Sequence, residues 1–145
     1  MRLISLVLAL TSLLGGCSGV TTRLEQQQQA WRYVAPRAYD FEYSWQCFCP
    51  GGGIWWHLTV EDGRVTNAAV VDSATPGKGG IIPPPEGWPT VDSVFARVTR
   101  ALASSDSVEV SYDPQFHFPS RVVVDRYRNA VDDEWTIQIR RFRAR

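Results

Sequence analysis

The chain has 145 residues, and its 15 lysine and arginine side chains balance 15 acidic ones, so the formal net charge at pH 7 is zero. This balance argues against a nucleic-acid-binding protein, which normally carries excess positive charge. The length suits one domain, and six Trp, five Tyr and six Phe can supply a compact aromatic core.

The N-terminus has the pattern of an export signal. Arg2 precedes an uncharged apolar run over residues 3–14, which is too short to span a hydrocarbon core of about 30 Å. The run leads into a Leu-Gly-Gly-Cys sequence that ends at Cys17 and matches a lipobox. We therefore expect residues 1–16 to be a cleaved signal peptide and Cys17 to become the lipidated N-terminus. The alternative is a plain signal peptide with a cysteine near its end.

Lipidation of Cys17 implies a location for the protein. Acyl chains such as palmitate hold a protein on a membrane, because each buried methylene contributes about 0.8 kcal/mol. Residues 17–29 are polar and small or flexible, so we expect a tether there. In a Gram-negative host, Ser18 favours the outer membrane, with the domain facing the periplasm. The expected partners are the membrane, through the anchor, and another envelope protein, but no nucleic acid.

We expect one domain over residues 30–145. Its first half is predicted to be a helix followed by strands. A helix is predicted over residues 25–37, where Pro36 should end or distort it. Asp62-Gly63 tolerates the positive φ of a two-residue hairpin turn. Alternating apolar residues predict three strands, over residues 39–46, 54–60 and 64–71.

The second half repeats this order after a long Pro- and Gly-rich loop over residues 72–89. Thr90 is a predicted N-cap, and the helix after it has apolar residues at the spacing of an amphipathic helix. They are Val91, Val94, Phe95, Val98 and Leu102. Three strands are expected over residues 108–112, 122–127 and 135–139. The order predicts an α+β domain, mainly antiparallel sheet with two helices, and is consistent with tandem helix–three-strand halves.

Several short motifs resemble those of a known family. They are Cys47-Phe48-Cys49-Pro50, Val60-Glu61-Asp62-Gly63-Arg64-Val65, Tyr112-Asp113-Pro114 and the stretch from Asn129 to Glu134. On these motifs, residues 38–142 resemble the small secreted or lipid-anchored bacterial proteins grouped as domain of unknown function 6174. Such proteins usually have Gly where this chain has His117, so we carry over no role for that hairpin. The resemblance implies a fold-sized unit and a cell location, and it implies no activity.

Cys47 and Cys49 are a candidate disulfide, because an exported protein can keep one. In a regular strand their Cα atoms would be about 6.6 Å apart, at the upper edge of the disulfide range, so a bulge or turn would have to bring them closer. Two reduced thiols, a redox pair, or a soft-metal site with His57 as third ligand are the alternatives. A redox pair more often opens a helix as Cys-x-x-Cys.

Other charged segments predict no chemistry. Asp132, Asp133 and Glu134 are consecutive, so their side chains alternate sides, and we expect a solvated turn whose carboxylates cap backbone amides or pair with Arg126 or Arg128. The four arginines over residues 140–145 suit contact with anionic lipid or a frayed strand end. Hydrolase motifs are missing from the sequence, and we assign no catalytic residue, cofactor or metal site.

The sequence therefore favours a non-enzymatic cell-envelope lipoprotein that binds a partner or acts as an accessory module. The competing hypothesis is a thiol-based redox or soft-metal-handling protein that uses Cys47 and Cys49.

Overall fold

The computed structural model describes residues 17–71 and 87–145, without the side chains of residues 17 and 18. The expected signal peptide, residues 1–16, and most of the predicted loop lie outside the described residues. The elements are α1 (Cys17–Val34), β1 (Ala38–Cys47), β2 (Trp55–Glu61), β3 (Arg64–Val70), α2 (Val91–Ser104), β4 (Ser107–Tyr112), β5 (Pro119–Asp125) and β6 (Trp135–Ala144). They confirm the α+β class. They also confirm the predicted order, in which a helix followed by three strands occurs twice along the chain.

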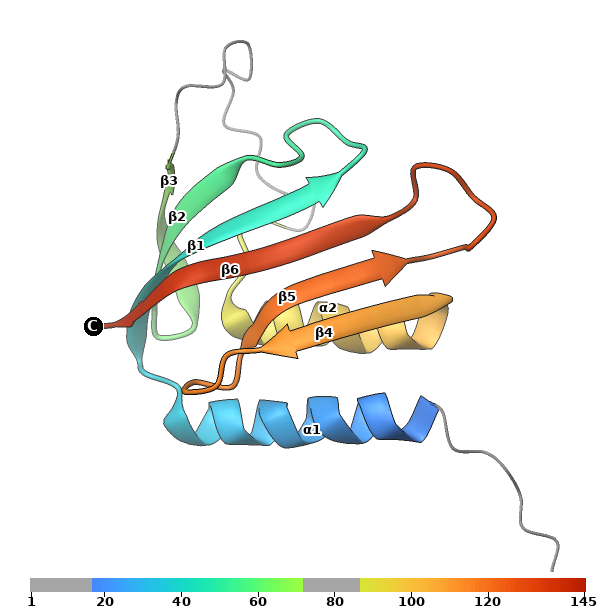
Figure 1. Cartoon of the computed structure of the whole chain (residues 1–145). Coiled ribbons are helices and arrows are strands. Elements are labelled where there is room, and N and C mark those ends of the chain that lie inside the picture. Colours follow the sequence, from blue (N-terminus) through green and yellow to red (C-terminus); the bar gives the residue numbers. More distant parts are fainter. Residues whose placement is uncertain (1–16, 72–86) are drawn as a thin grey trace, which may run out of the picture.

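The six strands form one antiparallel sheet in the order β3-β2-β1-β6-β5-β4, and both helices lie on one of its faces (Figure 1). The two halves meet where β1 pairs with β6. The first strand of one half is thus central, whereas β4, the first strand of the other, is at the edge. The halves share an element order but not an arrangement.

Two hairpins depend on residues in the left-handed region. The predicted turn between β2 and β3 has φ 48° at Asp62 and 75° at Gly63, as a two-residue hairpin turn needs. In the turn between β4 and β5, His117 adopts φ 66°. A side chain therefore takes the backbone conformation that glycine adopts most easily. Its Nδ1 lies 3.1 Å from Oε1 of Gln27 on α1, a contact that glycine could not make.

Helix α2 forms as predicted. The Thr90 hydroxyl accepts a hydrogen bond from the Ser93 N–H, which caps the helix. The buried face consists of Val91, Val94, Phe95, Val98 and Ala101. Leu102 is only partly buried at the rim of this face. The face packs against β4 and β5, and beside it Trp45 of β1 and Trp135 of β6 are only partly buried.

Helix α1 corrects the predicted tether. The segment expected to be flexible, residues 17–29, forms the first turns of a helix that begins at Cys17. Leu24 and Trp31 are buried, and their spacing of seven places them two turns apart on one face of the helix. The helix ends at Val34, because Pro36 disfavours helical backbone in the residue before it.

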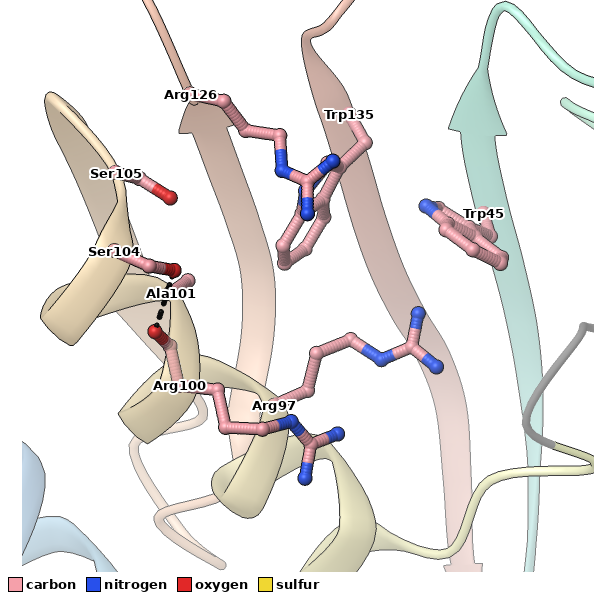
Figure 2. A pocket seen from close by; sticks show the side chains of 8 residues that line it. All are labelled: Trp45, Arg97, Arg100, Ala101, Ser104, Ser105, Arg126 and Trp135. Carbon is pink, nitrogen blue, oxygen red and sulfur yellow. Dashed lines mark hydrogen bonds between the residues drawn. The ribbon is translucent and has the colours of Figure 1, made fainter.

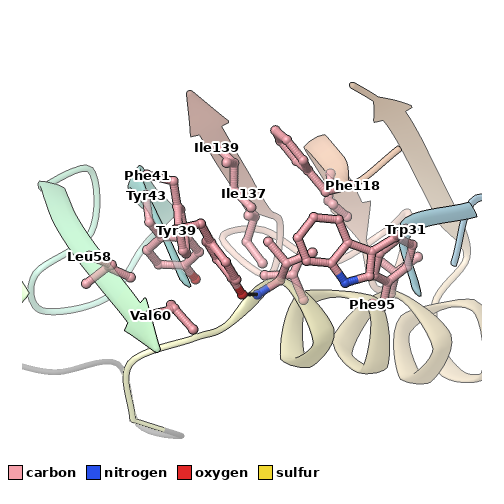
Figure 3. Close-up of a cluster of buried hydrophobic side chains, with 14 of the residues drawn as sticks. Trp31, Tyr39, Phe41, Tyr43, Leu58, Val60, Phe95, Phe118, Ile137 and Ile139 are labelled. Carbon is pink, nitrogen blue, oxygen red and sulfur yellow. Dashed lines mark hydrogen bonds between the residues drawn. The ribbon is translucent and has the colours of Figure 1, made fainter. Parts of the chain in front are cut away.

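Trp31 joins α1 to the rest of the core (Figure 3). Its ring makes edge-on contacts with Tyr39 of β1, Phe118 at the start of β5 and Phe142 of β6, at centroid distances of 5.7, 6.3 and 5.9 Å. Its Nε1 donates a hydrogen bond to Asp92 of α2 at 3.2 Å. Beside it, the Tyr39 hydroxyl accepts a hydrogen bond from the Val91 N–H at 3.2 Å. Burial raises the pKa of Tyr39 to about 12, so the phenol stays protonated.

We predict that Trp31→Ala lowers the free energy of unfolding by about 3–5 kcal/mol, because it removes a buried ring and leaves a cavity. Tyr33→Ala, two residues along the same helix, should change it by about 0.5 kcal/mol or less, because Tyr33 is 93% exposed. Urea denaturation followed by circular dichroism measures both. Equal effects of the two substitutions would show that α1 is not part of the core.

Candidate functional site

A cleft opens between the C-terminal half of α2 and the face of the sheet that the helices cover (Figure 2). Its volume is about 330 Å³. Its lining consists of Trp45, Arg97, Arg100, Ala101, Ser104, Ser105, Arg126 and Trp135. Three guanidinium groups and two indoles therefore surround one space.

The sequence brings these residues together through two periodicities. Arg97, Arg100 and Ser104 recur every three or four residues, so they share one flank of α2 beside its buried face. Trp45 on β1 and Trp135 on β6 point to the helix side of the sheet, and Cys47 pairs with Trp135 in the register. Because α2 covers only part of the central strands, these indoles face the cleft instead of a closed core.

Arg126 enters the cleft from the opposite wall, where β5 ends. Its carbonyl accepts a hydrogen bond from the Asp106 N–H at 3.1 Å, and Asp106 lies just after α2. The Asp106 carboxylate also accepts a hydrogen bond from the Arg128 N–H at 3.0 Å. These bonds hold the start of the β5–β6 loop beside the end of α2.

Hydrogen-bond donors of arginine and tryptophan are prominent in the lining of the cleft. The Arg97 guanidinium lies over the Trp45 ring, with Cζ 4.6 Å from the ring centroid, so the indole orients the cation. The Trp45 Nε1 is buried and has no hydrogen-bond partner among the described residues. Its N–H is a donor, as are the guanidinium N–H groups, and such donors suit carboxylate or phosphate oxygens.

The described lining contains no carboxylate, thiol or imidazole. Its polar side-chain groups are the guanidinium groups, the indole N–H groups and the hydroxyls of Ser104 and Ser105.

Sequence analysis missed this cleft. The signal it offered was the spacing of Arg97 and Arg100 beside the apolar stripe of the second helix. The two tryptophans are far apart in the sequence, and only the pairing of β1 with β6 brings them together.

Cys47 and Cys49 are joined by a disulfide, the first of the states that the sequence left open. Their Cα atoms are 5.2 Å apart, closer than in a regular strand, because β1 ends at Cys47 and the chain bends there. Gly52 folds back over this bend, where a Cβ atom would lie 2.5 Å from the Cys47 carbonyl oxygen. The two sulfurs are thus held in a tight loop and are not thiolates.

The proposed third metal ligand, His57, lies on the other face of the sheet, 3.8 Å from the Asp40 carboxylate. Residues 17–71 and 87–145 contain no group of three or more His, Cys, Asp and Glu side chains that could hold a metal ion.

The acidic stretch is solvent-exposed as expected at two of its three carboxylates, and Asp133 is the exception. Asp132 and Glu134 are exposed beside Phe48, and Asp132 has φ 70°. Both carboxylate oxygens of Asp133 are buried, with no hydrogen-bond partner within the described part of the chain. Asp106, and not this stretch, binds the backbone of Arg128.

The C-terminal arginines belong to the ordered strand β6. Between Glu42 and Asp40 of β1 the register shifts, and Arg141, at φ 53°, is the extra residue of a β-bulge. The bulge allows Arg140 and Arg141 each to bind a different oxygen of Glu42, both at 2.7 Å. The Arg140 guanidinium also lies over the Trp55 ring, with Cζ 3.8 Å from the ring centroid. Burial alone would raise the pKa of Glu42, but the two arginines outweigh it and lower the pKa.

The fold and the cleft together define an α+β protein with a cleft lined by arginine and tryptophan side chains. The chain belongs to a family of unknown function, DUF6174, whose sequence profile matches residues 23–144. The match covers every strand, α2 and most of α1. No curated protein and no solved structure matches the chain. No helix in the described part of the chain is long and apolar enough to cross a membrane.

We predict that Glu42→Gln lowers the free energy of unfolding at pH 7 by about 1–3 kcal/mol, because it removes two charge-assisted hydrogen bonds. The pKa of Glu42 is lowered on folding, so the ionised form adds stability above its ordinary value of 4.5, and this stability is lost as pH falls through the folded pKa. The difference between wild type and Glu42→Gln should therefore shrink below that value. Urea midpoints across this pH range measure it, with the exposed Glu109→Gln as control. A difference that stays constant with pH would contradict the assignment.

Proposed function

We propose that this protein is a non-enzymatic binding module of the bacterial cell envelope that holds an anionic ligand in the arginine–tryptophan cleft. The observation that carries the proposal is the convergence of Arg97, Arg100 and Arg126 with two indoles on one space. Guanidinium groups bind carboxylate and phosphate oxygens in pairs of parallel hydrogen bonds. Indoles pack against the apolar part of a ligand and exclude water from those bonds.

The envelope location rests on the lipobox. In this proposal residues 1–16 are removed, Cys17 carries the acyl chains, and Ser18 directs the protein to the outer membrane of a Gram-negative host. The chain then enters α1 at once, because the helix begins at Cys17. The domain is thus attached to its anchor by a helix that is itself packed on the sheet.

Thiol-based redox or soft-metal chemistry at Cys47 and Cys49 has weaker support. The two sulfurs are bonded to each other, and the residue suggested as third ligand lies on the opposite face. The disulfide is better understood as a covalent link that fixes the loop after β1, which is the strand that carries Trp45.

A direct test is calorimetric titration of glycerol 3-phosphate, a soluble phosphate monoester on a three-carbon polyol, into the full-length acylated protein in neutral detergent. We predict saturable binding that weakens as salt is added, because the contacts are between charges. The double variant Arg97→Gln, Arg100→Gln should bind roughly tenfold or more weakly, since a hydrogen bond to a charged group contributes about 1.5–3 kcal/mol.

Arg64→Gln is the matched control, because Arg64 is exposed beside the β2–β3 turn, away from the cleft. It removes one of the two charges that the double variant removes, and it should leave binding unchanged. Equal weakening by both sets of substitutions would mean that net charge, and not the cleft, attracts the anion, and would contradict the proposal.

A further inference from the structure

We propose that a loop surface, made by the side chains of Phe48, Tyr127 and Val131, inserts into the interface of the bilayer that holds the anchor on Cys17. The protein thus has two separate contacts with one membrane, its acyl chains and this surface. The inference rests on the proposed envelope location, and it needs no ligand in the cleft.

The loop surface consists of apolar side chains that the domain leaves open to solvent. Phe48 on the β1–β2 loop is 83% exposed, and Tyr127 and Val131 on the β5–β6 loop are 61% and 84% exposed. In the described part of the chain, Tyr33 is the one other large apolar side chain that is more than half exposed. Exposed apolar side chains that gather in one place mark a contact with a membrane or a protein.

The two loops that carry this surface are neighbours. Because β1 pairs with β6, Cys47 at the end of β1 is opposite Trp135 at the start of β6. Phe48 therefore lies next to the end of the β5–β6 loop, and it lines one hollow with Asp132 and Glu134. Figure 1 shows both loops at the same end of the sheet.

Both loops are held in place by bonds of their own. Phe48 stands between the two cysteines of the disulfide, which fixes the backbone on either side of its ring. In the β5–β6 loop, the Asp106 carboxylate accepts a hydrogen bond from the Arg128 N–H, and the Tyr127 carbonyl accepts one from the Ala130 N–H at 2.8 Å. Side chains on a fixed loop lose less conformational entropy on insertion than those of a flexible one.

Helix α1 begins at the same end of the domain as the loop surface. Gly19 and Val20 line one hollow with Val108 near the start of β4. The first residue of β4, Ser107, pairs with Asp125, and the β5–β6 loop begins directly after Asp125. Figure 1 agrees, since the start of α1 and the β5–β6 loop are at one end of the molecule.

The packing of α1 keeps this end near the membrane. Leu24 is buried in the domain, seven residues after Cys17, so at 1.5 Å per residue the helix places the anchor about 10 Å from the core. A flexible tether would let the domain turn in any direction. A helix packed through Leu24 and Trp31 leaves much less freedom, so the loop surface stays close to the bilayer.

The charges of the two loops favour an apolar contact over attraction to anionic lipid. Residues 48–54 carry no charged side chain, and residues 126–134 carry two arginines and three carboxylates, so the two loops together have a formal charge of −1. Tyrosine, with an apolar ring and a polar hydroxyl, is enriched at the membrane–water interface. Insertion of the loop surface therefore does not depend on anionic lipid.

The test uses an environment-sensitive fluorophore on Asn129→Cys, an exposed position between Tyr127 and Val131, in the full-length acylated protein on phosphatidylcholine vesicles. The vesicles contain a lipid with a nitroxide near the top of one acyl chain, which quenches a fluorophore in the interface. We expect the quenching to be several-fold larger than for the same fluorophore on Arg64→Cys, at the start of β3. Adding phosphatidylglycerol should not increase it.

A substitution on the other loop shows whether the surface acts as a unit. Phe48→Ser, in the protein labelled at residue 129, removes one exposed ring and should reduce the quenching several-fold. Tyr33→Ser is the matched control, because it removes a ring that is 93% exposed near the far end of α1, and it should leave the quenching unchanged. Equal quenching with and without Phe48, or quenching that requires phosphatidylglycerol, would overturn the proposal.

The titration with glycerol 3-phosphate separates this proposal from the proposed function. Binding of glycerol 3-phosphate by a protein whose residue 129 stays in water would overturn the bilayer as partner of the loop surface and leave the cleft as a binding site. Quenching at residue 129 without such binding would support the loop surface and contradict the ligand in the cleft. Protein that fails to float with the vesicles would overturn the anchor, and the loop contact with it.

Discussion

The arrangement of this protein depends on the packing of Trp31 between the two helices and the sheet. One indole contacts β1, β5 and β6 through its edge and face, and hydrogen-bonds α2 through its nitrogen. A buried ring of this size contributes a large share of the stability of a small domain. Because Trp31 belongs to α1, it also makes the N-terminal helix part of the core. The direction in which the chain leaves its proposed anchor is thereby set by the fold.

The position of the two helices has a second consequence. Helix α2 covers the half of the sheet made by β4 and β5, and Trp31 of α1 contacts the central strands β1 and β6. Trp45 of β1 and Trp135 of β6 point to the side of the sheet that normally faces a core, yet they line a cleft. Arginines on the flank of α2 and at the end of β5 form the other walls of this cleft. A partly covered sheet thus provides a site that is apolar on one side and cationic on the other.

Local patterns predicted the elements well, and long-range pairing is what they missed. Thr90 and the apolar spacing after it identified α2, and Asp62-Gly63 identified a hairpin, because both signals lie within a few residues. The helix predicted over residues 25–37 matches the second half of α1, but its first turns were mistaken for a tether, since only Leu24 and Trp31 mark its buried face within a polar, Gln-rich segment. The cleft could not be predicted, because no sequence pattern indicates that β1 pairs with β6. The bulge at Arg141 of β6 could not be predicted for the same reason, because its partner Glu42 is on β1.

The central claim of the proposed function is that α1, packed on the sheet through Trp31, fixes the domain on its anchor, so that the end of the domain where α1 begins faces the bilayer. It is tested most directly by the immersion depth of a nitroxide on Val131→Cys, compared with one on Arg64→Cys, in the acylated protein on vesicles. The introduced cysteine is the one free thiol when Cys17 is acylated and Cys47 and Cys49 are bonded. The account predicts that the label at residue 131 is accessible to oxygen dissolved in the bilayer and that the label at residue 64 is accessible to an aqueous nickel complex. Two labels that are equally accessible to the aqueous complex would contradict it.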